Sequence, residues 1–437
     1  MKEPNITVGI LTDSKIEFIL SSAYSINDVE VSGRQHVSYD KGKILWNEKH
    51  YDELLFIPRF AASASFELVN VMIGINFHWE RKEDQRFLGA LKIIIDDNEK
   101  ITAVNIISIE EYLTSVISSE MSANASLELL KAHAVISRSW VLSNINQQKG
   151  SLEKTKNSLV VNDEGYIKWY DRQAHTRFDV CADDHCQRYE GITRISTNIV
   201  KEAIKSTYGE VLVHKGKICD ARFSKCCGGV FEEFQNCWEN EVHPYLHKKR
   251  DSNSVNWVPN LKNEKEANKW IRTNPESFCN TKDKTILSQV LNSYDQETID
   301  FYRWKVVYSQ EELSKLIKDK SGIDFGSILD LIPIERGTSG RLVRLKFVGT
   351  KRTMIIGKEL EIRRLLSRTH LYSSAFVIDK YDYNEEQIPN RFEIIGAGWG
   401  HGVGLCQIGA AVMGAKGYTY EEILHHYFNG ANIEKQY

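Results

Sequence analysis

The sequence lacks the features that define several large classes of protein. No apolar run reaches the roughly 20 residues that a membrane-spanning helix needs. The formal net charge is −3, so the basic excess usual in nucleic-acid-binding proteins is missing. The first residues, Met1–Asn5, show none of the features of a signal peptide, which are a basic start, an apolar run and a small-residue cleavage site. We therefore expect no transmembrane segment and no nucleic-acid partner. Either the protein stays inside the cell, or a removed leader is missing from this sequence.

The sequence is also poor in signs of a disulfide framework. A chain of 437 residues is too large to need disulfide staples, and five of its eight cysteines lie between Cys181 and Cys227. This clustering suits metal binding or buried thiols at least as well as bridges. Cys226 or Cys227 could pair with Cys219 or Cys237 in an oxidising compartment, but without a visible leader buried free thiols are favoured.

What is present is a hydrophobic pattern that changes near residue 108. Short β-branched and apolar runs predict strands at Ile6–Leu11, Phe66–Val71, Leu91–Ile95 and Ile101–Ile107. Apolar residues at helical spacing then predict two helices, separated by a break at 122–124. The first begins near Ser108, and the second has Asn124 or Ser126 as a possible N-cap. Further helices are expected at Glu264–Trp270, Thr285–Leu291, Glu311–Lys318 and Tyr420–Leu424, and a strand at Leu342–Val348.

These patterns predict an α+β fold: a mixed, β-rich core with a helical pair and a partly helical inserted subdomain. We divide the chain into a β-rich region (1–100), a core with the helical pair (101–250), a polar insertion (251–330) and the C-terminal part of the core (331–437).

The helical pair contains the first candidate for chemistry, Glu120. This residue stands where the first helix ends and the break begins. A carboxyl group in such a position can face a groove while apolar neighbours raise its pKa, which is what a general acid needs near neutral pH. Composition alone favours an ordinary surface glutamate near a helix end.

Several ordered motifs favour the catalytic interpretation. The segments IEEYLTSVISSEM and LELLKAHAVISRSWVL resemble the two core motifs of the stage II sporulation protein D family, which includes the amidase-enhancer proteins. Later segments resemble further family motifs: Ala221–Ser224 with Gly228 and Gly229, Ser339–Arg341, GHGVGLCQIGA at 400–410, and Glu422–Phe428. The sequence departs from the family pattern at 122–125, at His133 and at Cys406. The resemblance covers most of the chain and is weakest at 251–330.

The resemblance implies a lytic transglycosylase, an enzyme that cleaves peptidoglycan glycan strands, and it suggests strands free of stem peptides as the substrate. The family's catalytic glutamate falls on Glu120. His401 and Gln407 are candidate contacts to sugar hydroxyl or acetamido groups, and Ser224 and Arg138 are further candidate substrate contacts. The substrate would place the protein in the cell envelope or periplasm, although no export signal is visible.

A second constellation consists of His175, Cys181, His185 and Cys186, two imidazoles and two thiols that fit a tetrahedral zinc shell. The adjacent pair His185–Cys186 departs from zinc-finger spacing. Some relatives in the family bind zinc through two cysteines and two histidines near a segment similar to Cys186–Gly191. The resemblance therefore implies a structural zinc ion. The alternative is a pair of buried thiols with surface histidines.

Two other functions are compatible with these motifs. The amidase-enhancer branch suggests a non-catalytic protein that binds peptidoglycan and acts with a cell-wall amidase. A cysteine hydrolase that pairs Cys406 with His401 is less favoured, because the two residues are five apart in a glycine-rich loop. That loop, 396–404, is not a Walker loop, since no Gly-Lys-Ser/Thr follows it. Its glycines would let the backbone approach a sugar chain or a neighbouring strand, or serve a purely structural role.

Overall fold

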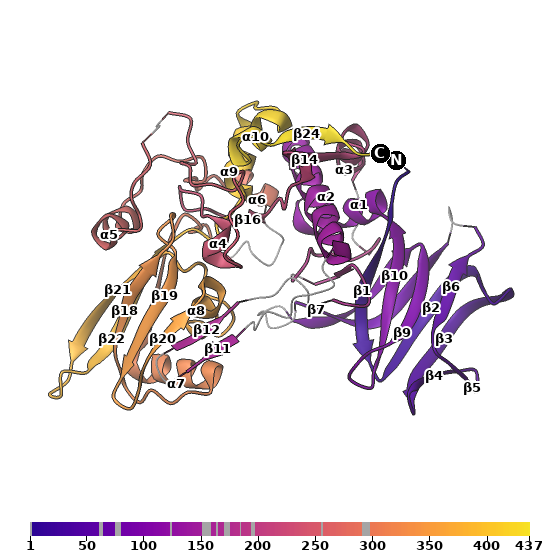
Figure 1. Ribbon diagram of the computed structural model, residues 1–437, viewed down its shortest axis with the longest axis horizontal. Coiled ribbons are helices and arrows are strands. Elements are labelled where there is room, and N and C mark those ends of the chain that lie inside the picture. The colour runs from indigo at the N-terminus through magenta and orange to yellow at the C-terminus, as the bar shows by residue number, and fades with distance from the viewer. Residues whose placement is uncertain are drawn as a thin grey trace. The chain divides into compact units, whose positions relative to one another are not determined.

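The computed structural model describes residues 2–60, 64–74, 80–122, 125–150, 159–162, 165–169, 175–183, 185–193, 197–254, 257–290 and 298–437. The chain forms two compact units. Unit 1 comprises residues 1–150, 172–211 and 434–437, and unit 2 comprises residues 151–171 and 212–433. Both units contain helices and sheets, so the predicted α+β class is confirmed (Figure 1). No helix in these described ranges combines the length and the apolar character needed to cross a bilayer.

Unit 1 is built on one large sheet with the strand order β13-β1-β10-β9-β6-β2-β3-β4-β5, and β7 joins β2 to β8. Its strands are β1 (Asn5–Asp13), β2 (Lys15–Ile26), β3 (Val29–Asp40), β4 (Lys43–Trp46), β5 (Lys49–Tyr51), β6 (Leu54–Pro58), β7 (Ser65–Ile73), β8 (Arg81–Leu88), β9 (Ala90–Ile95), β10 (Ile101–Ser108) and β13 (Val180–Cys181). Inward-facing aromatic side chains form much of the core, with Phe18 against Phe56 and Phe66 against Phe87. The four strands predicted before residue 108 are all present.

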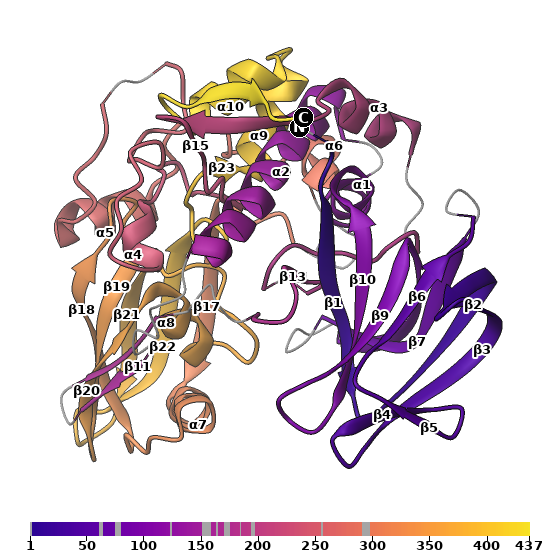
Figure 2. The ribbon, with the colours of Figure 1, turned by 45° about the vertical axis from the view of Figure 1, so that its right-hand side comes forward.

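The helices of unit 1 are α1 (Ile109–Glu120), α2 (Leu127–Gly150) and α3 (Asn198–Ser206). In both views α1 and α2 lie beside the end of the sheet where β10 finishes (Figures 1 and 2). Helix α1 begins directly after β10, and the Ser108 side chain caps it by accepting from the Glu111 N–H. Ser126 precedes α2 and accepts from the Leu129 N–H at 3.4 Å, in agreement with one predicted cap. The other candidate, Asn124, lies outside the described residues.

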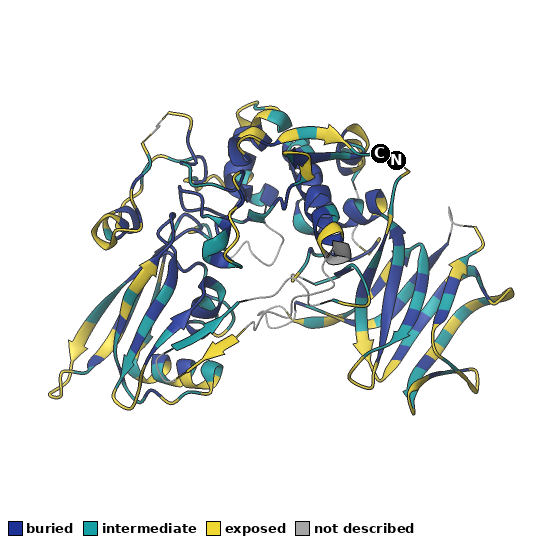
Figure 3. Ribbon diagram, in the orientation of Figure 1, coloured by how far each residue is buried: buried dark blue, intermediate teal, exposed yellow. Residues whose placement is uncertain are grey.

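Helix α2 is more deeply buried than its sequence suggested. The apolar residues Leu127, Leu130, Ala134 and Val141 predict one apolar stripe, yet residues 132–141 are all buried (Figure 3). The helix packs against α1 and α3. Its small side chains, including Ala132, Ala134 and Ser137, let neighbouring elements approach closely from more than one side. Charged or polar residues on this helix therefore need partners inside the protein.

Unit 2 contains several smaller sheets and most of the short helices. One sheet has the order β11-β12-β20-β19-β18, a second has the order β17-β22-β21, and β16 pairs with β23 in parallel. The strands are β11 (Leu159–Val161), β12 (Gly165–Lys168), β16 (Phe223–Ser224), β17 (Arg303–Ser309), β18 (Ile328–Arg336), β19 (Leu342–Gly349), β20 (Thr353–Gly357), β21 (Phe376–Tyr383), β22 (Pro389–Ala397) and β23 (Leu405–Cys406). The helices are α4 (Phe234–Cys237), α5 (Glu264–Arg272), α6 (Lys284–Val290), α7 (Gln310–Ser321), α8 (Glu359–Leu365), α9 (Gln407–Ala415) and α10 (Tyr420–Tyr427). A further sheet has the order β15 (Lys217–Ile218), β14 (Glu210–His214) and β24 (Asn432–Lys435).

The boundaries of the compact units differ from the four segments expected from sequence. No division occurs near residue 100, because β10 pairs with both β1 and β9. Residues 251–330, expected to be a polar insertion, belong to unit 2 together with the residues on either side of them. Strand β17 pairs with β22, and Leu313 and Ile317 of α7 share a core with strands β18 to β22. The sequence predicted a helix here, and α7 packs beside β17, which directly precedes it, and beside β22, which comes much later in the chain.

Candidate functional site

Glu120 is the last residue of α1, where the chain turns into the extended residue Met121. Its side chain is half-buried, while the neighbouring Ser119 and Met121 are buried. The Glu120 Oε1 atom accepts a hydrogen bond of 3.2 Å from the backbone N–H of Arg188. The position of a backbone N–H is set by the conformation of the main chain and not by a side-chain rotamer. The orientation of the Glu120 carboxyl therefore depends on the conformation of the segment around Arg188.

That segment, Cys186–Tyr189, is attached to several elements of unit 1. The Tyr112 hydroxyl of α1 donates to Gln187 Oε1 at 3.2 Å, and Gln187 Nε2 donates to the Ser137 carbonyl of α2 at 3.4 Å. The Tyr189 hydroxyl donates to Asn105 Oδ1 of β10 at 2.6 Å. These buried bonds place the Arg188 N–H beside the end of α1. Sequence reasoning missed Gln187, Arg188 and Tyr189 as supports for Glu120, although it had singled out their segment.

Burial and nearby negative charges change the pKa of the Tyr112 hydroxyl. Burial raises its pKa well above the ordinary value, and the negative charges of Cys186, Cys181 and Glu120 raise it further. Tyr112 therefore remains a neutral hydrogen-bond donor. These interactions bring the carboxyl group, the two thiols and the phenol into one electrostatic environment.

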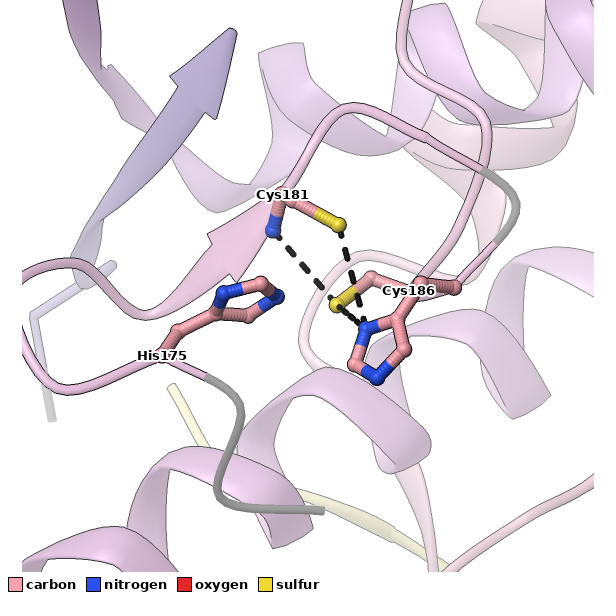
Figure 4. A group of neighbouring side chains, drawn as sticks. His175, Cys181 and Cys186 are labelled. Atoms are coloured by element: carbon pink, nitrogen blue, oxygen red, sulfur yellow. Dashed lines mark hydrogen bonds between the residues drawn. The ribbon is translucent and has the colours of Figure 1, made fainter. Parts of the chain in front are cut away.

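The predicted zinc ligands converge in unit 1. The candidate ligand atoms of His175, Cys181, His185 and Cys186 all lie within 4.8 Å of one another. Figure 4 shows the Cys181 and Cys186 sulfur atoms turned toward each other, with the His175 ring alongside. His185 Nδ1 lies 3.9 Å from Cys181 Sγ and 3.4 Å from Cys186 Sγ. The two histidine rings pack edge to face with centroids 5.1 Å apart.

Two observations test whether this donor set fits a metal ion. His175 Nε2 is buried and has no hydrogen-bond partner among the described residues, as expected for a nitrogen oriented toward a cation. The contact with Cys186, together with contacts with His175 and His185, lowers the pKa of Cys181 to about 2 against the effect of burial. Thiolate and imidazole are the ligands that zinc prefers. The residues present therefore fit the ion.

A cavity of about 410 Å³ lies beside this cluster. The residues that line it include His175, Cys181, His185, Arg188 and Gln85. The Gln85 side chain is 1% exposed, and neither its oxygen nor its nitrogen has a hydrogen-bond partner among the described residues. A buried amide without partners is available to a bound molecule or to water. Nothing in the sequence around Gln85 signalled this role.

The structure gives Arg138 a different role from the predicted substrate contact. Its side chain has no exposed surface, and it forms two hydrogen bonds with the Glu110 carboxylate, at 2.8 and 2.6 Å. Its remaining terminal nitrogen donates to the Glu210 carbonyl at 2.9 Å. All three donor groups are used inside the protein. We therefore assign Arg138 to the positioning of α1 against α2.

The other predicted substrate contacts, Ser224, His401 and Gln407, belong to unit 2, whereas Glu120 belongs to unit 1. Ser224 pairs with Cys406 across β16 and β23, and Gln407 is the next residue along the chain, so these residues are neighbours. Gln407 is 2% exposed. The Ser224 hydroxyl oxygen is buried and has no hydrogen-bond partner among the described residues. The predicted candidates therefore fall into two groups, one in each unit.

His401 is a neutral imidazole within this second group. Its Nδ1 atom accepts from the Val403 N–H at 3.0 Å, and its ring packs against Trp238 with centroids 4.8 Å apart. Burial lowers its pKa well below the ordinary value, and the positive charges of Arg222 and Arg341 lower it further. His401 can therefore take part in hydrogen bonds, but it does not carry charge at neutral pH.

Cys406, the nucleophile of the hydrolase alternative, has no exposed surface. Its sulfur accepts a hydrogen bond of 3.2 Å from the Cys227 N–H and lies among other buried thiols. A nucleophile must reach the substrate carbonyl, so this burial argues against the hydrolase interpretation.

The glycine-rich loop approaches the protein itself. Gly398, Gly400, Gly402 and Gly404 all have positive φ, between 73° and 90°. A side chain at Gly402 would meet the Arg341 guanidinium at 2.4 Å, and one at Gly404 would meet the Arg222 carbonyl oxygen at 2.0 Å. Of the alternatives drawn from the sequence, close backbone packing accounts for these two glycines.

We expect Gly404→Ala to destabilise unit 2 by about 2–4 kcal/mol, because a left-handed backbone and a steric overlap both penalise the added carbon. Gly417→Ala is the matched control, since Gly417 has a φ of 85° but nothing within 4 Å of the added atom. The control should cost only about 1–2 kcal/mol. Thermal unfolding of both variants measures the difference, and equal losses would contradict the steric argument.

Two stretches of the chain match models of known protein families. Residues 97–214 match the family model described as "Stage II sporulation protein", and residues 232–404 match a "Domain of unknown function", DUF8618. The first match includes α1, α2 and the cysteine–histidine cluster. The second includes the glycine-rich loop as far as Gly404.

Three curated relatives illustrate the similarity. The chain is 26% identical over 347 residues to an uncharacterized protein of Brachyspira hyodysenteriae, which covers 79% of this chain and 72% of the relative. It is 26% identical over 332 residues to the amidase enhancer of Bacillus subtilis, covering 74% of this chain but only 40% of that protein. It is 22% identical over 333 residues to stage II sporulation protein D of Bacillus subtilis, covering 76% of each chain. The resemblance inferred from the motifs is confirmed.

Proposed function

Because this chain carries a domain of the stage II sporulation protein family at residues 97–214, we propose that it acts in the bacterial cell wall as a peptidoglycan lytic transglycosylase. Its substrate would be the glycan strand of alternating N-acetylmuramic acid and N-acetylglucosamine, preferably without stem peptides. The observation that supports this proposal most directly is the half-buried Glu120 carboxyl at the end of α1, oriented by the Arg188 N–H. The Glu120→Gln variant tests it.

The proposed reaction needs one carboxyl group and no external water. Protonated Glu120 donates its proton to the glycosidic oxygen as the bond from that oxygen to the muramic acid C1 breaks. The resulting carboxylate then accepts the proton of the muramic acid 6-hydroxyl, whose oxygen attacks C1. The products are a free 4-hydroxyl on one strand and a 1,6-anhydro ring on the other. Most glycosidases use a second carboxylate, because they must activate water or form a covalent intermediate.

The proposed zinc ion would be held by His175, Cys181, His185 and Cys186. It would supply a rigid cross-link between the segment that ends in Cys181 and the segment that begins at His185. Arg188 lies two residues after Cys186, and its N–H bonds to Glu120. The cluster would therefore act on catalysis by fixing this backbone donor, while Glu120 carries out the proton transfers.

We expect Cys181→Ser to lose the zinc of this cluster and to cleave glycan about 10- to 100-fold more slowly, the range found when supports of a metal site are removed. The measurements are zinc content by inductively coupled plasma mass spectrometry and strand cleavage. Cys219→Ser is the control, because Cys219 is also a thiol but is buried and outside the cluster. Full zinc content in Cys181→Ser would contradict the assignment.

The similarity to an amidase enhancer supports a second candidate function. In that case the protein binds peptidoglycan and stimulates a cell-wall amidase without cleaving glycan itself. The two functions differ in a simple assay of the purified chain. A lytic transglycosylase releases anhydro ends from glycan strands with no amidase present, whereas an enhancer changes only the rate of added amidase.

A further inference from the structure

A second group of metal-ligating side chains lies in unit 2, far in sequence from the first. It consists of Cys227, Asp251, Cys279 and Cys406, whose ligand atoms all lie within 4.8 Å of one another. Their exposed fractions are 2%, 0%, 0% and 0%. Three thiols and a carboxyl group thus meet in the interior, although each comes from a different segment of the chain.

The spacing of these atoms suits one shared cation. Cys227 Sγ and Cys279 Sγ are 3.5 Å apart. In a tetrahedral site with zinc–sulfur bonds of about 2.3 Å, two sulfur ligands are separated by about 3.8 Å. A disulfide would require about 2.05 Å between the sulfur atoms. An iron–sulfur cluster contains several metal ions and would need its ligands farther apart.

The surroundings of the sulfur atoms point independently to a metal-bound state. Cys227 Sγ accepts from the Gly229 N–H at 3.3 Å, and Cys406 Sγ accepts from the Cys227 N–H at 3.2 Å. Ser277 Oγ lies 3.6 Å from Cys279 Sγ. Backbone N–H groups directed at sulfur stabilise a thiolate, the form of cysteine that binds metals. Cys406 is also the N-cap of α9, where the helix dipole favours negative charge.

Asp251 is supported in the same way. The Tyr427 hydroxyl donates to its Oδ1 atom and the Cys279 N–H donates to its Oδ2 atom, both at 3.0 Å. His426 Nε2 lies 3.4 Å from Oδ1. A carboxylate without exposed surface needs opposite charge close by, and a coordinated cation supplies it. Hydrogen bonds that hold a ligating carboxylate in place are a regular feature of metal sites.

We propose that Cys227, Asp251, Cys279 and Cys406 bind a structural zinc ion in unit 2. Zinc is the divalent ion best suited to a closed tetrahedral site of three thiolates and one carboxylate. On binding, each of the three thiols releases its proton to solvent, and the sulfur lone pairs form the bonds to the metal. Cys226 borders this site but lies outside the set of four.

The position of this site gives it a structural consequence. It joins the turn at 227–229, the loop at Asp251, the turn at 277–279 and the start of α9. Cys406 lies two residues after the glycine-rich loop, which carries His401, and directly before Gln407, so the ion would hold the chain between these two residues. The inference does not depend on the proposed transglycosylase activity, because metal content and folding report on it directly.

The test uses the full chain with the first cluster disabled by Cys181→Ser, so that any remaining metal belongs to unit 2. We expect one equivalent of zinc in this protein, and none after the further change Cys279→Ser. Cys219→Ser in the same background is the control, since Cys219 is a buried thiol outside both groups and should leave the equivalent in place.

A second measurement guards against a variant that fails to fold. Co²⁺ replaces Zn²⁺ in the Cys181→Ser protein, and absorption then reports tetrahedral thiolate ligation through a near-ultraviolet charge-transfer band. Alkylation with mass mapping should show Cys227, Cys279 and Cys406 protected until a chelator and denaturant are added. A protein without metal and without the cobalt band would overturn the proposal, as would a Cys227–Cys279 disulfide in the mass map.

Discussion

Glu120→Gln should bind isolated glycan strands as tightly as the unaltered protein and cleave them at least about 100-fold more slowly, since general acid–base groups typically contribute about 10²–10⁴ in rate. Glutamine has nearly the same shape as glutamate, and its side-chain oxygen can still accept the Arg188 N–H that now bonds to Glu120 Oε1. The amide has no acidic proton to give to the glycosidic oxygen. It also cannot accept the proton of the 6-hydroxyl.

Mass spectrometry of the strand ends distinguishes the possible chemistries. Anhydro ends from the unaltered protein would support intramolecular attack, while reducing ends would show that water is the nucleophile. Digestion of strands with and without stem peptides measures the substrate preference. Glu111→Gln is the matched control, because Glu111 is an exposed glutamate in the first turn of the same helix. Cleavage by Glu120→Gln at the rate of this control would remove Glu120 from the mechanism.

Local signals in the sequence predicted the helical pair closely. The apolar spacing of Ile109, Leu113 and Val116 is enough to orient α1, and a serine directly before each helix supplies its cap. The first cysteine–histidine cluster was also detectable, because all its members lie between residues 175 and 186. Such features depend on residues that are near one another in the chain.

Contacts between distant segments had no comparable signal. The sequence did not indicate whether Arg138 faces a substrate or a carboxylate, because its partner Glu110 lies 28 positions earlier. Cys279 and Asp251 stand alone in the sequence, without metal-ligand spacing, and the fold brings them to Cys227 and Cys406. The sequence predicted buried thiols here but not the carboxylate among them. Both omissions concern buried polar groups whose partners are set by tertiary packing.

Glu110→Ala should cost about 3–5 kcal/mol of stability in unit 1, because removal of one partner of a buried ion pair leaves the other charge unpaired. Glu110 Oε1 accepts from Arg138 at 2.8 Å, from the Gly209 N–H at 3.3 Å and from the Tyr437 hydroxyl at 2.5 Å. The Arg138 side chain has no exposed surface from which water could replace these contacts.

Two variants separate this effect from a general loss of helix stability. Glu111→Ala removes the neighbouring carboxylate from the same helical turn. Because Glu111 is exposed, this variant should lose only about 0.3–1 kcal/mol of stability, the size of a helix-dipole interaction. Glu110→Ala combined with Arg138→Met removes both charges and should recover much of the loss, as found when buried pairs are replaced by apolar residues. Hydrogen exchange in α1 and α2 measures the stability of unit 1 alone. A single melting temperature cannot do so, because the chain has two units.

The ion pair also bears on catalysis through geometry. Glu110 lies in the first turn of α1 and Glu120 in its last, so a shift of the helix against α2 would move the catalytic carboxyl away from the Arg188 N–H. Glu110→Ala should therefore lower the cleavage rate even at temperatures where the variant remains folded, and the double variant should restore part of it. If Glu110→Ala matches Glu111→Ala in both exchange and cleavage, the pair does not position α1, and the burial of Arg138 has another purpose.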